Sequence, residues 1–199
     1  MRLIFIRRTI TSNQNLESRL EYPYIGIDES NHGGKREIVV AVISYNPSSI
    51  VENKNEKGGN LRKIRGLNKP LEDLLNGDDF RFLFLERGSC KNYGYNFVKL
   101  TAIERLVTSF GVDLSGTQII VDGDFPRGCS DNSNKEDGQR SFYPTVKLPR
   151  LKFVAHADVI YPIVNKADEI ASLLRNYYRD FKSYADGLKY EKYKVGFTC

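Results

Sequence analysis

The stretch Tyr24-Ile25-Gly26-Ile27-Asp28-Glu29 decides how this chain folds, because it is a short apolar run that ends abruptly in two acids. A turn-forming cluster follows at residues 31–34, and a second apolar run occupies residues 37–44. The second run is β-branched and nearly unbroken, as expected of a strand buried on both faces. Two such runs joined by a glycine-containing loop predict an antiparallel β-hairpin.

Working outward from the hairpin, the apolar pattern predicts further strands and helices. Aromatic or β-branched runs indicate strands, and apolar residues at helical spacing indicate helices. The order of these elements predicts one mixed α/β sheet covered by helices. The predicted elements are a short helix at 70–75, a strand at 80–85, a helix at 96–110, strands at 117–123 and 151–155, and a helix from Pro162 to about residue 184.

Length and composition indicate a single globular domain. The chain has 199 residues, of which 40% are hydrophobic and 28% charged, which is far from a disordered composition. We expect an N-terminal arm at 1–21 and one domain at 22–199. Polar stretches at 46–69 and 124–147 are expected to be loops. The net charge of +5 permits a polyanionic partner without requiring one.

Cysteine usage and hydropathy bear on where the protein works. The three cysteines, Cys90, Cys129 and Cys199, lie far apart and lack metal-binding spacing. An odd count of this kind indicates a reducing compartment and no disulfide framework. No apolar run approaches the roughly 20 residues of a membrane span. We therefore expect a cytoplasmic, soluble protein that does not bind membranes and is a monomer.

Acidic residues follow three of the predicted strands. Asp28 and Glu29 end the first, Asp122 ends another, and Asp158 follows the strand at 151–155. Ligands of open α/β sheets bind beyond the strand ends, so these acids are expected to converge. Converging carboxylates repel one another unless a cation lies among them, and hard ions such as Mg²⁺ or Mn²⁺ suit them. Any one of these acids alone is more typical of a turn or a helix cap.

Three short motifs carry these acids in a fixed order: Tyr24-Ile25-Gly26-Ile27-Asp28-Glu29-Ser30, Ile120-Val121-Asp122-Gly123, and Ala157-Asp158-Val159-Ile160-Tyr161-Pro162. The first resembles the Gly-Ile-Asp-Glu-Ala-Gly opening of type 2 ribonucleases H (ribonuclease HII). The second resembles that family's second acidic strand end. The third resembles its motif in which an aspartate stands four residues before a helix-opening proline.

This resemblance implies a ribonuclease H-like mixed β-sheet flanked by helices, and a catalytic site. It implies that Asp28, Glu29, Asp122 and Asp158 bind Mg²⁺ or Mn²⁺. The implied reaction is endonucleolytic cleavage of RNA within an RNA–DNA hybrid by a two-metal mechanism. A nucleic acid duplex is the expected partner, and such a hybrid is sensed through its shape and its 2′-hydroxyls.

The chain departs from the family mainly in residues that would contact the substrate. The family's Gly-Arg-Gly loop is replaced by Asn31-His32-Gly33-Gly34, so His32, Gly33 and Gly34 are candidate substrate contacts. His156 stands where the family usually has a lysine, and Lys166 lies nearby in the last helix. A histidine near neutral pH is able to shuttle a proton, although surface histidines without a role are equally common.

Asp168 is a secondary candidate, because it stands in the last helix where the family has a serine, one turn from Val164. It is either a fifth acid of the site or, in the interpretation we favour from sequence, an exposed helix aspartate.

Two alternative functions remain open. The stretch 122–128 resembles the Asp-Gly…Pro-Arg segment of endonuclease V, which has a related fold and acts on DNA. In that interpretation Glu86 replaces Glu29 as a ligand. The other alternative is a non-catalytic nucleic-acid-binding module, but a module of that kind has no reason to keep four acids that repel one another.

Overall fold

The computed structural model describes residues 22–30, 36–52, 71–86, 95–124, 148, 150–179 and 190–197. The arm expected at 1–21 and most of the two expected loops lie outside these residues. Where residues 46–52 are described, the expected loop contains a short 3₁₀-helix, η1 (Pro47–Ile50), which Asn46 caps by accepting a hydrogen bond from the Ser48 amide.

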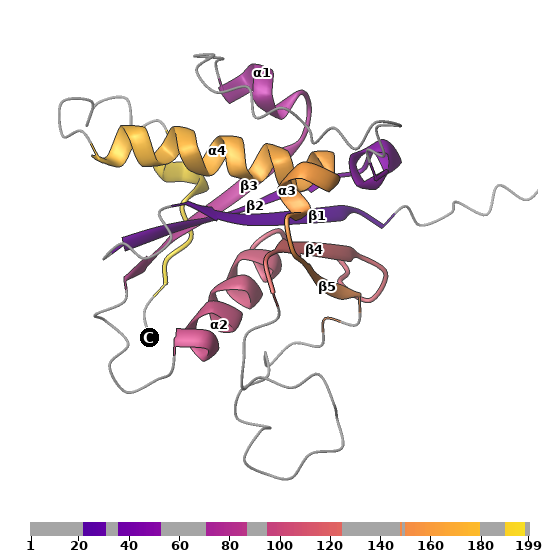
Figure 1. Cartoon of the computed structure of the whole chain (residues 1–199), viewed down its shortest axis with the longest axis horizontal. Helices are drawn as coiled ribbons and strands as arrows, with labels where there is room; N and C mark the ends of the chain where they lie inside the picture. The colour runs from indigo at the N-terminus through magenta and orange to yellow at the C-terminus, as the bar shows by residue number, and fades with distance from the viewer. Residues whose placement is uncertain are drawn as a thin grey trace, which may run out of the picture.

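A five-stranded mixed sheet forms the centre of the fold (Figure 1). Its strands lie in the order β3-β2-β1-β4-β5. The predicted hairpin is confirmed, because β1 pairs antiparallel with β2, with Ile27 opposite Ala41. β4 pairs parallel with β1, and β5 pairs parallel with β4, so these three strands end at the same edge of the sheet. The strand bounds are β1 (Tyr24–Ser30), β2 (Arg36–Ser44), β3 (Asp79–Glu86), β4 (Gln118–Asp122) and β5 (Leu151–Val154).

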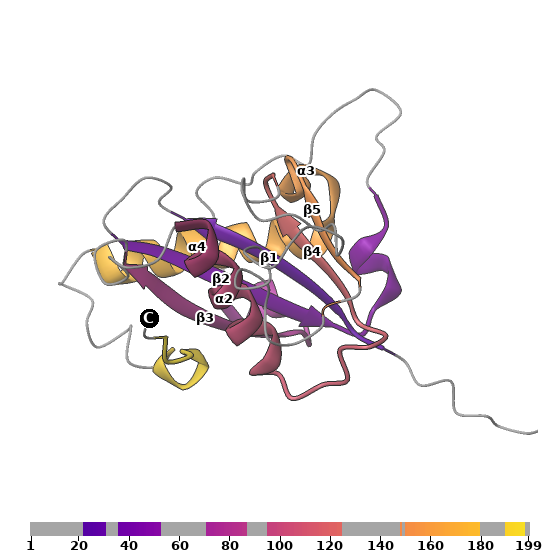
Figure 2. The ribbon, with the colours of Figure 1, turned by 90° about the horizontal axis from the view of Figure 1, so that it is seen from below.

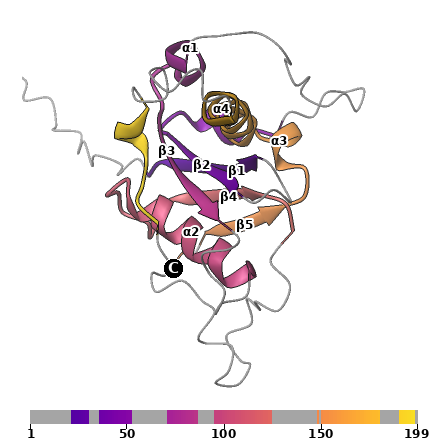
Figure 3. The same cartoon turned by 90° about the vertical axis from the view of Figure 1, so that its left-hand side faces the viewer.

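Helices cover both faces of this sheet. Helix α4 (Pro162–Arg179) packs on one face across β1 and β2, and α2 (Tyr95–Thr108) packs on the other, against β2 and β3. Figure 2 shows α2 on the near side of the sheet and α4 behind it, and Figure 3 shows α4 end-on above the strands. The shorter α1 (Leu71–Leu75) lies beside α4. None of the described helices is long and apolar enough to cross a membrane.

The alternation of side chains along β1 divides its residues between two cores. Ile25 and Ile27 are buried on the α2 side of the sheet. The residues between and after them, Gly26 and Asp28, face α4. Gly26 allows the closest approach: a Cβ atom built there would lie 2.7 Å from the backbone carbon of Ile163 in α4. The absence of a side chain at Gly26 therefore brings α4 down onto the strand that carries Asp28.

Gly26→Ala is expected to lower the free energy of unfolding by at least ~1–3 kcal/mol, the usual range for overpacking a filled core. The neighbouring atoms are backbone and cannot rotate away. Gly196→Ala is a matched control, because a Cβ there meets nothing within 4 Å. Urea unfolding measures both variants. Equal stability of the two would show that α4 is free to move away from β1.

The chain's C-terminal segment, residues 190–197, covers the outer edge of the sheet. The amide of Val195 donates a hydrogen bond of 2.7 Å to the carbonyl of Phe82, and Lys194 forms a parallel bridge with the same residue. The 3₁₀-helix η4 (Glu191–Tyr193) in this segment places the Tyr193 ring against Phe80, with ring centroids 4.4 Å apart. Figure 3 shows the segment in yellow beside β3.

Candidate metal centre

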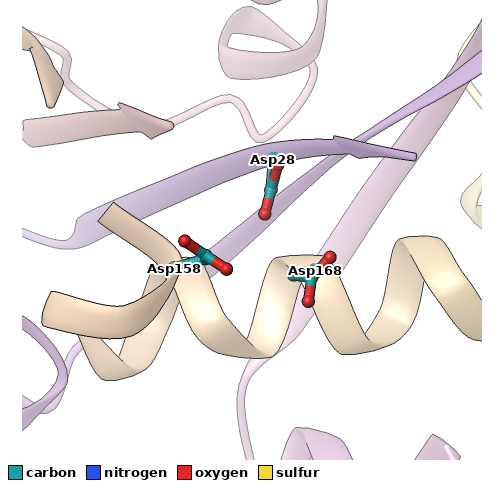
Figure 4. Close-up of side chains that lie close together, drawn as sticks. All are labelled: Asp28, Asp158 and Asp168. Atoms are coloured by element: carbon teal, nitrogen blue, oxygen red, sulfur yellow. The ribbon is translucent and has the colours of Figure 1, made fainter. Parts of the chain in front are cut away.

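Asp28 lies near the C-terminal end of β1 with only 4% of its surface exposed. Strand alternation turns its side chain toward α4, and Figure 4 shows its carboxyl group pointing at that helix. One carboxylate oxygen, Oδ1, accepts a hydrogen bond of 2.6 Å from the amide of Glu29. The centre of the site is therefore a buried carboxylate between the sheet and a helix.

Asp158 lies beside Asp28, but a helix and not a strand end holds it there. The expectation that it follows directly on a strand is wrong, because β5 ends at Val154 and Asp158 lies in the one-turn helix α3 (Ala157–Ile160). His156 turns the chain with a left-handed backbone (φ 59°). The amide of Ala157 then donates a 2.6 Å hydrogen bond to Oδ1 of Asp122. This turn buries Asp158, which is 7% exposed.

Asp168 completes the cluster from α4. One carboxylate oxygen each from Asp28, Asp158 and Asp168 lie within 4.8 Å of one another (Figure 4). The interpretation of Asp168 as an exposed helix aspartate is wrong, because the residue is half-buried. The helical period carries the signal for this position: Asp168 lies four residues after Val164 and three before Ala171, both of which are fully buried.

Asp122 lies beside this group, half-buried at the end of β4. Its hydrogen bond to Ala157 joins the end of β4 to the start of α3. Its charge helps to raise the pKa of Asp28, and the charge of Asp158 helps to raise the pKa of Asp122. Four aspartates from β1, β4, α3 and α4 thus form one acidic centre at the edge where the parallel strands end.

Burial and mutual repulsion make this centre costly to ionise. Burial, and then the charges of Asp122, Asp168 and Asp158, raise the pKa of Asp28 from 3.8 to about 8, against a lowering by the Glu29 amide. Burial and the charge of Asp158 also raise the pKa of Asp122. A cation among the carboxylates would remove this penalty.

The spacing of the carboxylates fits a small divalent ion. Two oxygens bound to the same ion lie at most twice the bond length apart, about 4.2 Å for Mg²⁺ and about 5 Å for Ca²⁺. The upper limit of 4.8 Å for the three oxygens is close to this range, so small side-chain rotations suffice. A donor set made only of carboxylates favours hard ions such as Mg²⁺ and Mn²⁺.

Glu29 lies on the other face of the sheet from Asp28. Its carboxylate oxygen Oε1 is 2.7 Å from Nζ of Lys99 in α2, and the two side chains are 10% and 11% exposed. The structure therefore places this sequence-predicted ligand in a buried ion pair on the α2 side.

Lys99→Met is expected to destabilise the protein by about 3–5 kcal/mol, because it leaves the charge of Glu29 buried without its lysine. The double variant Glu29→Gln/Lys99→Met should recover most of this loss, since neither charge remains. Lys194→Met is a matched control, because its ion pair with Glu191 is exposed and worth about 0–1 kcal/mol. Urea unfolding of the four proteins checks this; a neutral effect of Lys99→Met would contradict it.

The remaining candidate residues make other contacts, are exposed, or lie outside the described chain. Lys166 forms an ion pair with Asp78 and donates a 3.0 Å hydrogen bond to the carbonyl of Leu75, next to α1. His156 is exposed at the start of α3. Glu86 is exposed at the end of β3, and β2 separates that strand from β1. His32, Gly33 and Gly34 lie outside the described residues.

Comparisons with known proteins agree with the fold. No family model matches the chain, and no curated protein sequence matches it. Among solved structures, the chain is similar to the ribonuclease H2 from Pyrococcus horikoshii OT3, with 16% identity, a TM-score of 0.50, and coverage of 83% of this chain and 77% of that one. It also matches the Archaeoglobus fulgidus complex of PCNA with RNase HII, with 16% identity, a TM-score of 0.48, and coverage of 82% and 78%.

The mixed five-stranded sheet with flanking helices is thus similar in fold to a solved archaeal ribonuclease H2. At this level of identity the similarity concerns the fold. The resemblance predicted from the three motifs is confirmed in that respect, and the chain has a ribonuclease H-like fold.

Proposed function

We propose that this protein is a metal-dependent endonuclease that hydrolyses phosphodiester bonds. The observation that carries the proposal is the buried Asp28 carboxylate beside those of Asp158 and Asp168, at the edge of the sheet where parallel strands end. A purely structural role explains such an arrangement poorly, because burial and the neighbouring acids raise the pKa of Asp28 and so make its ionised form costly.

In this proposal the aspartates bind Mg²⁺ or Mn²⁺, with Asp28 at the centre. Asp122 holds the start of α3 through the amide of Ala157 and thereby positions Asp158. Asn165 supports the same turn by donating a 2.9 Å hydrogen bond to the carbonyl of Asp158. The ions that these residues would hold, two of them in the two-metal form of the reaction, would supply Lewis acidity that favours ionisation of a water and offsets negative charge on the phosphodiester.

RNA in an RNA–DNA hybrid is the substrate that we favour. Its support is the order and spacing of the motifs at 24–30, 120–123 and 157–162, which resemble those of type 2 ribonucleases H, together with the shared fold. An endonuclease V-like action on DNA has less support, because its ligand Glu86 lies two strands away from Asp28, roughly 10 Å at the usual strand spacing. A binding module without activity leaves the buried aspartates unexplained.

Cleavage of four labelled duplexes tests the proposal: an RNA–DNA hybrid, a DNA duplex with a single ribonucleotide, plain DNA, and inosine-containing DNA. Each is incubated with Mg²⁺, with Mn²⁺ and with EDTA. We expect metal-dependent cleavage of the hybrid or of the single-ribonucleotide duplex. Cleavage of inosine-containing DNA alone would favour the endonuclease V-like alternative, and no cleavage of any substrate would overturn the proposed activity.

A further inference from the structure

We propose that Asp168 of α4, and not Glu29 of β1, supplies the additional carboxylate of the metal centre. This inference rests on the proposed function and names a different ligand set from the one that the motifs imply. Asp168 belongs to none of the three motifs that resemble type 2 ribonucleases H, and Glu29 belongs to the first of them.

The position of Asp168 is fixed by how α4 packs. The residues around it, Val164, Ala167 and Ala171, are fully buried against the sheet, so the face of α4 that carries Asp168 is turned toward β1. The missing side chain at Gly26 lets the helix approach that strand closely, two residues before Asp28. Figure 4 shows Asp168 and Asp158 on the helical side and Asp28 on the strand between them.

The position of Glu29 is fixed by a different contact. It is adjacent to Asp28 in an extended strand, so the two side chains leave opposite faces of the sheet. Lys99 holds its carboxylate at 2.7 Å, with both side chains about nine-tenths buried. Turning Glu29 toward the metal centre would twist the end of β1 and leave the ammonium group of Lys99 buried without this partner.

The two acids therefore have separate tasks. Asp168 faces the cation, and Glu29 with Lys99 ties the end of β1 to α2 on the other side of the sheet.

Binding of Mn²⁺ to the substrate-free protein tests this assignment, measured by electron paramagnetic resonance of the free ion and by the rise in melting temperature. Four variants are compared with the natural protein. Asp168→Asn removes the proposed ligand and Asp168→Glu keeps its charge. Glu29→Gln/Lys99→Met removes both partners of the ion pair, and Asp73→Asn is a control at an exposed aspartate of α1.

We expect Asp168→Asn to weaken Mn²⁺ binding by about tenfold or more, as loss of one charged ligand does, and Asp168→Glu to restore part of it. The double variant and Asp73→Asn should bind Mn²⁺ within about threefold of the natural protein. Melting curves without metal establish that each variant is folded.

Two results would overturn the assignment, and they have different meanings. If the natural protein binds Mn²⁺ and Asp168→Asn binds it equally well while the Glu29 double variant does not, Glu29 is the ligand and only this inference fails. If the natural protein does not bind Mn²⁺ at all, the metal centre of the proposed function fails with it.

Discussion

Asp28→Asn is expected to lower the rate of phosphodiester cleavage at least ~1,000-fold, equivalent to about 4 kcal/mol of transition-state stabilisation, while making the metal-free protein more stable. The loss of rate follows because Asp28 is the central carboxylate of the proposed metal centre. The gain in stability follows because the substitution removes a buried charge that three other aspartates repel. We expect that gain to be on the order of a few kcal/mol at pH 8.

Single-turnover cleavage with Mg²⁺ and urea unfolding in EDTA measure the two effects on the same preparations. Asp73→Asn is the control, because the same chemical change at an exposed aspartate of α1 should alter neither quantity. Opposite changes in activity and stability are typical of a functional site that is held at a cost in stability. A loss of both would show instead that Asp28 holds the fold together.

The second prediction concerns pH, where the metal-free protein should lose stability as the pH rises toward 8. The pKa of Asp28 is about 8 in the folded protein against 3.8 as its ordinary value, so the folded state binds the proton more tightly. Its contribution to stability is fully present below pH 3.8 and is lost as the pH rises through about 8. One such group contributes at most about 1.4 kcal/mol per pH unit, and Asp122 acts in the same direction.

Urea unfolding at pH 5, 6.5 and 8 checks this, with EDTA and with Mg²⁺. In EDTA the free energy of unfolding should fall by about 2–4 kcal/mol over this range. Mg²⁺ should reverse the fall at pH 8, since it binds the ionised carboxylates of the folded state. In the Asp28→Asn variant, the free energy of unfolding in EDTA should depend on pH much more weakly. A stability that rises with pH in EDTA would contradict the assignment of Asp28 as a buried acid with a raised pKa.

Most of the fold follows from local patterns in the sequence. The runs at 24–29 and 37–44 are rich in apolar residues and are separated by a turn cluster, so the hairpin was predictable. The helical period after Pro162 likewise predicted α4. The turn at His156 was not predictable. Its left-handed backbone and the Ala157–Asp122 hydrogen bond depend on a residue 35 positions earlier in the chain. The start of α3 therefore depends on a contact with the end of β4, which the local sequence does not contain.

The site shows the same division between local and distant causes. The strand ends identified Asp28 and Asp122, because parallel strands deliver their last residues to one edge. The position of the Glu29 side chain depends on its ion pair with Lys99, 70 residues away. It also depends on strand alternation, which places adjacent side chains of an extended strand on opposite faces of the sheet. Asp168 required knowledge of which face of α4 meets β1. Motif spacing does not contain that information.

The C-terminal segment along β3 has a consequence for how the molecule behaves among its copies. A bare edge strand offers its amides and carbonyls to any other chain and promotes aggregation. Here Val195 and Lys194 pair with Phe82 at the outer edge of β3. The aromatic side chains of Phe80, Phe82 and Tyr193 pack together beside them. Residues 190–197 therefore shield part of this edge from other chains, and we expect a variant that lacks them to self-associate more readily.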